Sequence, residues 1–308
     1  MSPKHTPAEK LRNQFIGSTV GFRWFRGQRR VSSQHAHEVA TTLDAADDRI
    51  VPPSKRLLDH RMPEVKQLVK LKNTALAEWR DRTLPYPERG IRLLRKSLLV
   101  AHEDAMKLLQ SQIDEAAAQL ENRRAEIIAD AATKLGKTFN FADFPSSFVG
   151  AFQINLGYPS LHPDEALKYL NIAVYDTQNA MVAERFDQAV ALAEQAFRDE
   201  LAKLVARMCE RLDGKLDKGK PKVFRDSLVT NLTDFFAQFK QLNVGSSDEL
   251  DELVAKAQMA VKGVTPDKLR DNAQLQQSVR KQMLKIETKL TGAMVAKPTR
   301  KLMKKKIA

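Results

Sequence analysis

The sequence predicts a mainly α-helical protein with a long antiparallel helical hairpin, a small β element and a C-terminal helical subdomain. Aromatic residues make up only 6% of the 308 residues, and Ala, Leu, Lys, Glu and Gln predominate, as is typical of helices. Two segments, 97–135 and 175–212, repeat apolar residues every eleven positions. This period follows a relaxed helix almost straight along one side. We therefore expect two long helices that pair as an antiparallel coiled coil.

The eleven-residue period relates similar side chains in both segments. The first segment repeats two sets, which are Ala105, Ala116 and Ile127, and Leu109, Leu120 and Ala131. The second repeats Phe186, Phe197 and Met208, and also Val190, Leu201 and Leu212. Each helix would bury one continuous stripe, and the residues between the two segments would reverse the chain.

The clearest strand signal lies at residues 18–32, after a polar stretch at 1–17 that predicts a flexible arm. Its apolar side chains alternate with small or polar ones and are Val20, Phe22 and Trp24. A Gly27-Gln28 turn follows, so we expect a β-hairpin here. A second alternating stretch at 153–158 is expected to pair with this hairpin.

Capping residues and prolines divide the rest of the chain. Pro63 suits the first position of a helix, Ser33 is a candidate N-cap, and the stretch 246–249 is expected to cap the helix that follows it. The prolines in segment 84–87 exclude helix there and favour a rigid crossover over a recognition loop. The shorter elements expected are helices near 34–45, 63–79, 164–170, 223–242, 248–261 and 272–294, and a strand at 91–94.

These elements predict a division of the chain into successive parts. In order they are a flexible arm at 1–17, a β-hairpin with helices at 18–96, the long helical hairpin at 97–213, a C-terminal helical subdomain at 222–294 and a basic tail at 295–308.

The net charge of +13 is unevenly distributed. Residues 1–100 have a balance of +10, residues 101–214 a balance of −7, and residues 215–308 a balance of +10. Basic surfaces attract polyanions, of which nucleic acid is the commonest in a cell. The alternative is that the basic flanks neutralise the acidic long helices within the fold.

The strongest candidate binding surface is the predicted hairpin, where four arginines accompany Phe22, Trp24 and Phe25. Such a ribbon can hold phosphates and stack bases, although the aromatic rings could instead belong to the core. The predicted nucleic-acid-binding residues are Arg23, Phe25, Arg26, Arg29 and Arg30 of the hairpin, and Lys301, Lys304, Lys305 and Lys306 of the tail.

No catalytic motif accompanies this basic surface, so the sequence leans towards a protein that is not an enzyme. The six histidines and Cys209 have no metal-ligand spacing, and no cofactor motif is present. The single cysteine excludes an intramolecular disulfide. The polar N-terminus and the lack of a long apolar run predict a cytoplasmic protein without a membrane span.

Several stretches resemble an uncharacterised family of helical proteins from bacteria, including planctomycetes, and from phages and mobile elements. They are 20–25 (VGFRWF), 55–59 (KRLLD), 84–94 (LPYPERGIRLL), 141–145 (FADFP) and 223–227 (VFRDS). The resemblance covers most of the chain from about residue 18 to 290 and carries no catalytic motif. Some similar proteins are encoded beside hexameric ATPases or DNA-processing enzymes, which implies an accessory role.

The sequence therefore favours a non-catalytic accessory protein that binds nucleic acid through its basic terminal regions. The alternative is a helical scaffold or adaptor that binds a protein partner, such as an ATPase, along the acidic long helices.

Overall fold

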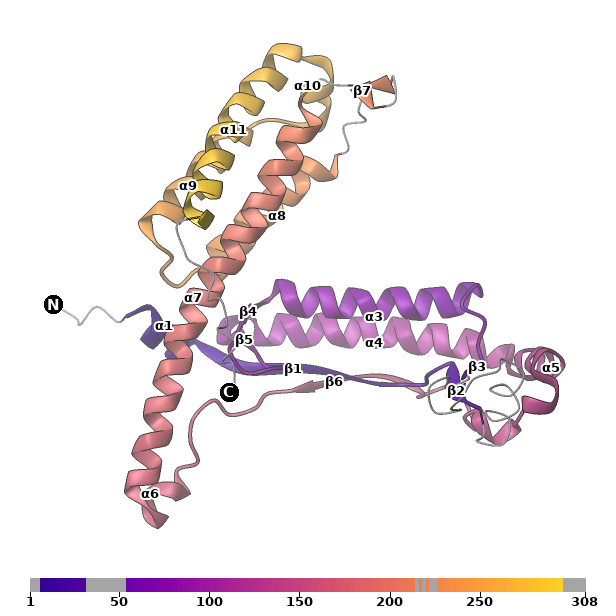
Figure 1. The fold of residues 1–308 in the computed structure, drawn as a ribbon. Helices are drawn as coiled ribbons and strands as arrows, with labels where there is room; N and C mark the ends of the chain where they lie inside the picture. Colours follow the sequence, from indigo (N-terminus) through magenta and orange to yellow (C-terminus); the bar gives the residue numbers. More distant parts are fainter. Residues whose placement is uncertain (1–5, 32–53, 214–215, 218–219, 222–225, 296–308) are drawn as a thin grey trace, which may run out of the picture. The chain divides into compact units, whose positions relative to one another are not determined.

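The computed structural model describes residues 6–31, 54–213, 216–217, 220–221 and 226–295 (Figure 1). The fold is mainly α-helical with a small β-sheet, as predicted. The chain forms two compact units, each assembled from segments that are distant in sequence. Unit 1 comprises Met1–Phe15, Leu84–Arg89 and Leu161–Ala308, and unit 2 comprises Ile16–Thr83 and Gly90–Ser160. The predicted hairpin segment 97–213 is therefore shared between the two units.

Unit 2 is built on an antiparallel pair of helices, α3 (Pro63–Asp81) and α4 (Leu99–Asn122), which lie side by side (Figure 1). Pro63 stands at the start of α3, as predicted. The chain breaks from helical geometry at Arg123, which precedes α5 (Arg124–Leu135). The guanidinium of Arg123 donates to Glu64 of α3 at 3.0 Å and to Glu126 of α5 at 2.8 Å. The predicted first long helix is therefore two helices with a bend between them.

The predicted pairing of the two long helices is wrong in its choice of partners. In unit 2, α4 packs against α3, whereas α7 (Ile172–Arg211) belongs to unit 1 and packs against α11 (Ala273–Val295) and α1 (Pro7–Gln14). A shared apolar period shows that each helix buries one face, but it does not select the element that covers that face.

The four-stranded sheet has the order β4-β5-β1-β6. Its strands are β1 (Phe15–Trp24), β4 (Thr83–Pro85), β5 (Arg92–Arg95) and β6 (Phe152–Gly157). β1 and β6 are antiparallel, with Thr19 opposite Gly157 and Trp24 opposite Phe152. The expected pairing between the two strand segments is thus confirmed.

The predicted N-terminal hairpin is wrong, because β2 (Gln28–Arg30) does not fold back on β1. It pairs antiparallel with β3 (Ser54–Arg56) instead. The backbone N–H of Phe25 donates to the carbonyl of Ala151 at 2.9 Å. The pairing of these two segments therefore extends one residue beyond Trp24 and Phe152. The chain then turns at Gly27, whose carbonyl accepts from the N–H of Leu57 at 2.8 Å.

Unit 1 is helical and is centred on α7, whose buried stripe includes Phe186, Phe197 and Met208 as the eleven-residue period predicts. The ring of Phe197 packs edge-on against Phe235 and Phe239 of α8. The remaining helices are α6 (Ala166–Leu170), α8 (Ser227–Leu242), α9 (Asp248–Val261) and α10 (Pro266–Asp271). A short strand pair joins β7 (Leu216–Asp217) to β8 (Lys220–Pro221). The C-terminal helices thus share a unit with α7.

The predicted flexible arm is wrong for residues 7–14, which form α1. Thr6 caps this helix in a reciprocal box with Glu9, and Leu11 is fully buried. The predicted helix at 34–45 and the basic tail at 297–306 lie outside the described residues. No helix in the described part of the chain is both long and apolar enough to cross a bilayer.

Candidate nucleic-acid interface

Five exposed arginines of unit 2 lie near the end of β1, in the turn that follows it and on the β2–β3 pair, and we call them the arginine surface. They are Arg23 on β1, Arg26 in the turn, Arg29 and Arg30 on β2, and Arg56 on β3. Among the described residues, none of the five forms an ion pair with a carboxylate. The positive charge of this surface is therefore not neutralised by the described part of the fold.

Pairing between β2 and β3 places these side chains on two faces. Arg29 is opposite Lys55, and Arg30 is opposite Ser54. Lys55 points into the unit, where its ammonium lies 2.5 Å from Asp143 and donates to the carbonyl of Thr138 at 2.6 Å. Arg30 therefore shares the other face with Arg56, its diagonal neighbour on β3.

The aromatic residues of this region support the strands instead of lying free. Phe25 is half-buried against Phe148, with ring centroids 5.8 Å apart. Trp24 meets Phe152 edge-on at 5.0 Å. The guanidinium of Arg29 lies 6.0 Å from the centroid of Phe25, so this ring orients an arginine. The predicted stacking of a base on Phe25 would require the ring to leave the apolar cluster that it joins.

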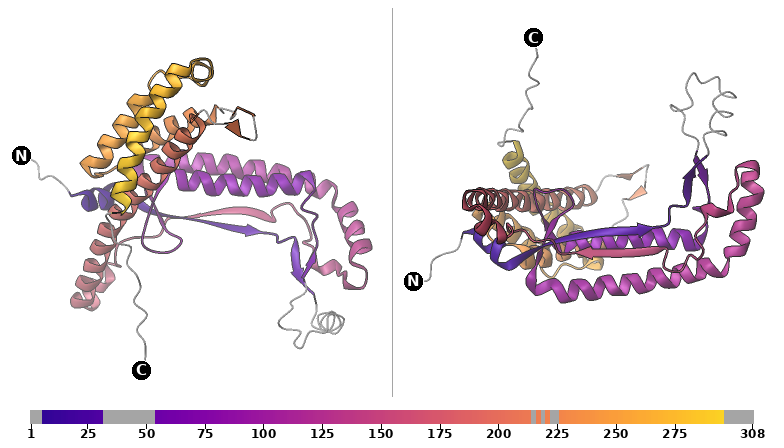
Figure 2. Two further views of the ribbon diagram at one scale, coloured as in Figure 1. Left: turned by 45° about the horizontal axis from the view of Figure 1, so that its top comes forward. Right: turned by 90° about the horizontal axis from the view of Figure 1, so that it is seen from below.

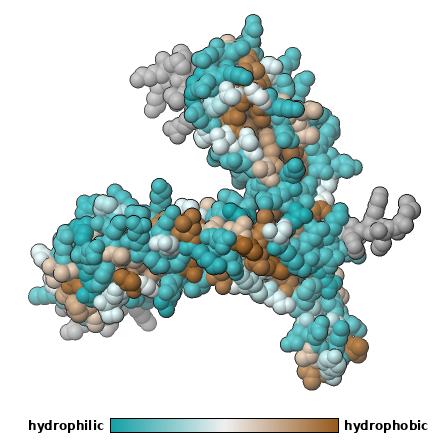
Figure 3. Space-filling view, turned by 180° about the vertical axis from the view of Figure 1, so that it is seen from behind, coloured by the Kyte–Doolittle hydropathy of each residue, from teal (hydrophilic) through white to brown (hydrophobic). Residues whose placement is uncertain are grey.

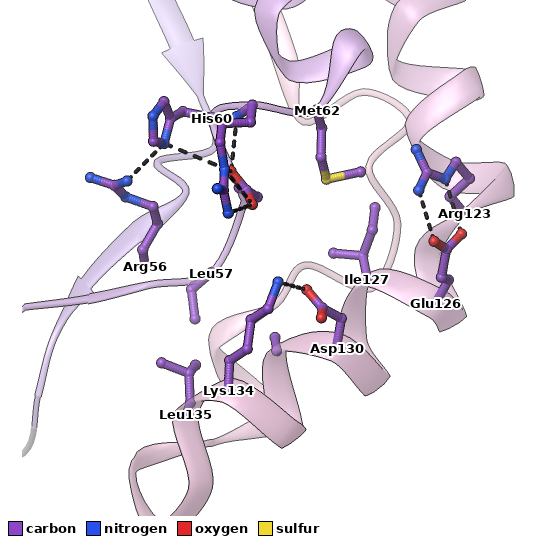
Figure 4. A pocket seen from close by; sticks show the side chains of 13 residues that line it. Arg56, Leu57, His60, Met62, Arg123, Glu126, Ile127, Asp130, Lys134 and Leu135 are labelled. Carbon is purple, nitrogen blue, oxygen red and sulfur yellow. Dashed lines mark hydrogen bonds and ion pairs between the residues drawn. The ribbon is translucent and has the colours of Figure 1, made fainter.

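A hollow of about 790 Å³ adjoins Arg56 between the β3–α3 connection and α5 (Figure 4). Its floor is apolar and is formed by Leu57, Met62, Ile127, Ala131 and Leu135. Its rim is charged, but most of these charges are paired. Arg61 binds Asp59 at 2.9 Å, and Lys134 binds Asp130 at 2.6 Å. Arg56 is the exception, because within the described part of the chain its guanidinium bonds only to the ring nitrogen Nδ1 of His60, at 2.7 Å.

The paired carboxylates of the rim are held in their ionised form. Hydrogen bonds from Arg61 keep the pKa of Asp59 well below its ordinary value. Hydrogen bonds from Arg123 likewise lower the pKa of Glu126. A general acid needs a carboxyl group that is protonated near neutral pH, so neither residue suits that role.

The described residues contain no cluster of three or more His, Cys, Asp or Glu side chains arranged to hold a metal ion. The thiol of Cys209 is buried in α7, far from a reactive form: burial and then the charge of Glu287 raise its pKa to about 12. The chemistry that the arginine surface offers is hydrogen bonding and charge, which suits the binding of phosphates.

The structure places the four predicted arginines on β1, β2 and the turn between them, all exposed, and its β2–β3 pairing puts Arg56, which the sequence did not single out, diagonally beside Arg30. Arg56 is separated from Arg30 by 25 intervening residues, and no spacing rule links the two positions. The predicted tail residues Lys301, Lys304, Lys305 and Lys306 lie outside the described residues.

Comparison with protein-family models gives no match for this chain, and neither the curated proteins nor the solved structures contain a significant match.

Proposed function

We propose that this chain is a non-catalytic accessory protein that binds nucleic acid through the arginine surface of unit 2. The observation that carries the proposal is the group of five exposed guanidinium groups without carboxylate partners among the described residues. The basic tail at 295–308 would add affinity for the same polyanion.

Guanidinium groups suit this role because their donors match two phosphate oxygens at once. Each phosphate that an arginine neutralises also releases condensed counterions, so binding weakens steeply as salt rises. Arg26, Arg30 and Arg56 are the best placed for such contacts, since each is exposed and no described carboxylate competes for it. Arg23 donates to the carbonyl of Gly150 at 3.0 Å and keeps further donors.

The test removes three of these charges together in the triple variant Arg26→Ser, Arg30→Ser, Arg56→Ser. We expect weaker binding to all sequences and a salt dependence that is flatter by about three units of slope, one for each phosphate contact. Fluorescence anisotropy with labelled DNA and RNA across a salt series measures both quantities. Circular dichroism establishes first that the variant is folded.

A matched control removes the same charge from the helices of unit 2, in the variant Lys66→Ser, Lys70→Ser, Lys107→Ser. These lysines are exposed on α3 and α4. The control should keep most of the affinity and the parental salt slope. Equal losses in both triple variants would mean that only net charge matters and that the arginine surface is not the site.

The second candidate function is that of a helical adaptor for a protein partner, such as an ATPase. It is favoured by an exposed apolar tip in unit 1, where Tyr169, Leu170 and Ile172 are 90%, 80% and 66% exposed. These residues lie on α6 and at the start of α7, where brown atoms gather at the end of the helix (Figure 3). Exposed apolar clusters of this kind are typical of protein interfaces.

The adaptor function is tested by replacing all three tip residues with serine. Because they contact little of the fold, the variant should keep its melting temperature. A protein that is captured from the native host by the parental chain, and that survives nuclease treatment, should be lost with the variant. Unchanged capture would exclude the tip as the binding surface.

A further inference from the structure

One face of the β1–β6 pair is left open by the described helices of unit 2. The other face points to the helices, where Phe22 and Ile154 join the apolar cluster around Trp79. Seen from below, the two strands lie in front of α3, and α4 runs beside β6 (Figure 2, right). The open face consists of the alternate residues Thr19, Gly21 and Arg23 of β1, and Gln153, Asn155 and Gly157 of β6.

The side chains of the open face are those that read base edges. Arginine pairs with guanine, asparagine and glutamine pair with adenine, and threonine contacts several bases. Arg23 lies directly opposite Gln153, and Asn155 lies directly opposite Gly21. Arg23 and Asn155 are exposed, and Gln153 is half-buried. Gly21 leaves the middle of this face without a side chain, and Gly157 does the same at one end.

The edge of β6 that faces away from β1 is held by α4. Gln110 of α4 donates from Nε2 to the carbonyl of Phe152 at 3.1 Å and accepts at Oε1 from the N–H of Ile154 at 2.7 Å. These bonds occupy backbone groups of β6 and fix the strand to α4. A rigid support keeps the side chains of the open face in place, which precise recognition requires.

We propose that the open face of the β1–β6 ribbon enters the major groove of duplex DNA, with Arg23, Gln153 and Asn155 directed at base edges. Arg26, Arg30 and Arg56 then contact the flanking phosphates. This inference rests on the proposed nucleic-acid binding and specifies its ligand class.

The geometry favours duplex DNA over other nucleic acids. In this arrangement only β1 and β6, which are about 4.8 Å apart, enter the major groove, which is about 12 Å wide, and β5 on the other side of β1 stays outside it. The pairing covers six residue pairs, or about 20 Å of ribbon. The major groove of duplex RNA is too narrow and deep for a ribbon. Single strands are bound mainly by free aromatic rings, whereas Trp24 and Phe25 are packed against the fold.

The probes are a short DNA duplex, the RNA duplex of the same sequence and each single strand, measured with the full-length chain. We expect the DNA duplex to bind about tenfold more tightly than the RNA duplex at equal salt. Dimethyl sulfate footprinting should show protection of guanine N7, which lies in the major groove, and no protection of adenine N3 in the minor groove.

A substitution at Gly21 tests the proposal directly, because this residue lies in the centre of the open face. A Cβ atom there meets only Asn155, at 3.8 Å, so a side chain fits without a clash. Gly21→Glu should weaken DNA binding about tenfold or more through repulsion by phosphates. Gly21→Gln provides the uncharged counterpart, and Gln67→Glu adds the same charge at an exposed position of α3 and should bind normally.

A second variant separates base reading from phosphate binding. Gln153→Ala, Asn155→Ala removes no charge, so its affinity for unselected DNA should stay within about twofold of the parental value. The parental chain is first used to enrich sequences from a pool of randomised duplexes. The variant's preference for these sequences over unselected DNA, measured as a ratio of affinities, should fall by about 5- to 150-fold for each base that Gln153 or Asn155 no longer contacts.

Three outcomes separate the two proposals. The ribbon in the groove is supported by three results together: protection of guanine N7, preference for the DNA duplex, and weaker DNA binding by Gly21→Glu. Binding without N7 protection, equal for DNA and RNA duplexes, overturns this inference and leaves nucleic-acid binding by the arginine surface intact. Failure to bind any of the probes at low salt overturns both.

Discussion

At the scale of single residues, burial decides which polar groups can act. His102 lies in the interior of unit 2, and its two ring nitrogens have no hydrogen-bond partner among the described residues. Burial, and then the positive charge of Arg82, lower the pKa of His102, while Glu78 and Glu103 oppose this effect. Histidine thus stays neutral here, in contrast to the exposed arginines that remain available to ligands.

His102 should make the fold sensitive to acid. Because its pKa is lower in the folded state than the ordinary value of 6.5, the unfolded chain binds a proton first as pH falls. Folding stability is unaffected above this value and decreases below it, by up to about 1.4 kcal/mol per pH unit. His102→Phe should reduce this slope between about pH 7 and pH 5 in urea titrations. His60→Gln, at an exposed histidine, is the control, and equal slopes in all three proteins would contradict the prediction.

Cys209 should react slowly in the folded protein. A thiol whose pKa rises from 9.0 to about 12 has on the order of a thousandfold less thiolate near neutral pH. A disulfide reagent followed by absorbance should therefore modify the native chain far more slowly than the chain in urea. A native rate close to the denatured rate would show that α7 and α11 open readily around this residue.

At the scale of elements, one close backbone contact positions the arginine surface. Gly27 lies between β1 and β2, and its carbonyl accepts from the backbone N–H groups of both Leu57 and Leu58. A Cβ atom at this position would lie 2.9 Å from Cβ of Leu58 and 3.2 Å from its Cγ. The β2–β3 ribbon therefore depends on a residue without a side chain at the turn that precedes it.

Gly27→Ala should destabilise the protein by about 1–3 kcal/mol, because the buried Leu58 must move. It should also weaken nucleic-acid binding, since Arg29, Arg30 and Arg56 lie on the displaced strands. Thermal unfolding and anisotropy measure the two effects. Gly21→Ala, with its ordinary 3.8 Å contact, should change the stability much less. If Gly27→Ala and Gly21→Ala have the same melting temperature, the contact at Gly27 is not tight in solution.

At the scale of the whole molecule, the chain crosses repeatedly between two compact units. Unit 1 is joined internally by Arg198, whose side chain is only 8% exposed. Its guanidinium binds Glu194 on α7, and Ser247 and Glu249 at the start of α9, at 2.9–3.0 Å. This cluster ties α9 to α7 and contains no residue of unit 2.

Arg198→Ala should destabilise unit 1 selectively, by about 2–3 kcal/mol, since the lost hydrogen bonds involve charged groups. Amide hydrogen exchange followed by mass spectrometry should show faster exchange in α7 and α9, and little change in α3 and α4. Equal acceleration in both sets of helices would mean that the two units unfold as one.

The sequence by itself determined the local elements. Short-range periodicity and capping predict the helical class and the start of α3 at Pro63. They also predict the buried stripe of Phe186, Phe197 and Met208, and the two strands at Val20 and Ile154. These signals are properties of contiguous residues, so they can be recognised without knowing which other element packs against the segment. Part of the candidate site could also be predicted from the sequence, because four of its arginines lie within a stretch of eight residues.

Only the tertiary structure decided which elements meet. Helix α4 packs on α3 within unit 2, α7 packs on α11 within unit 1, β2 pairs with β3 and not with β1, and Arg56 is the diagonal neighbour of Arg30 across a long sequence gap. Phe25 lies in an apolar cluster because Phe148, more than a hundred residues away, covers it. The physical reason is that an apolar face or a strand edge is satisfied by any complementary surface. The choice among such surfaces depends on the free energy of the whole fold, which no local pattern records.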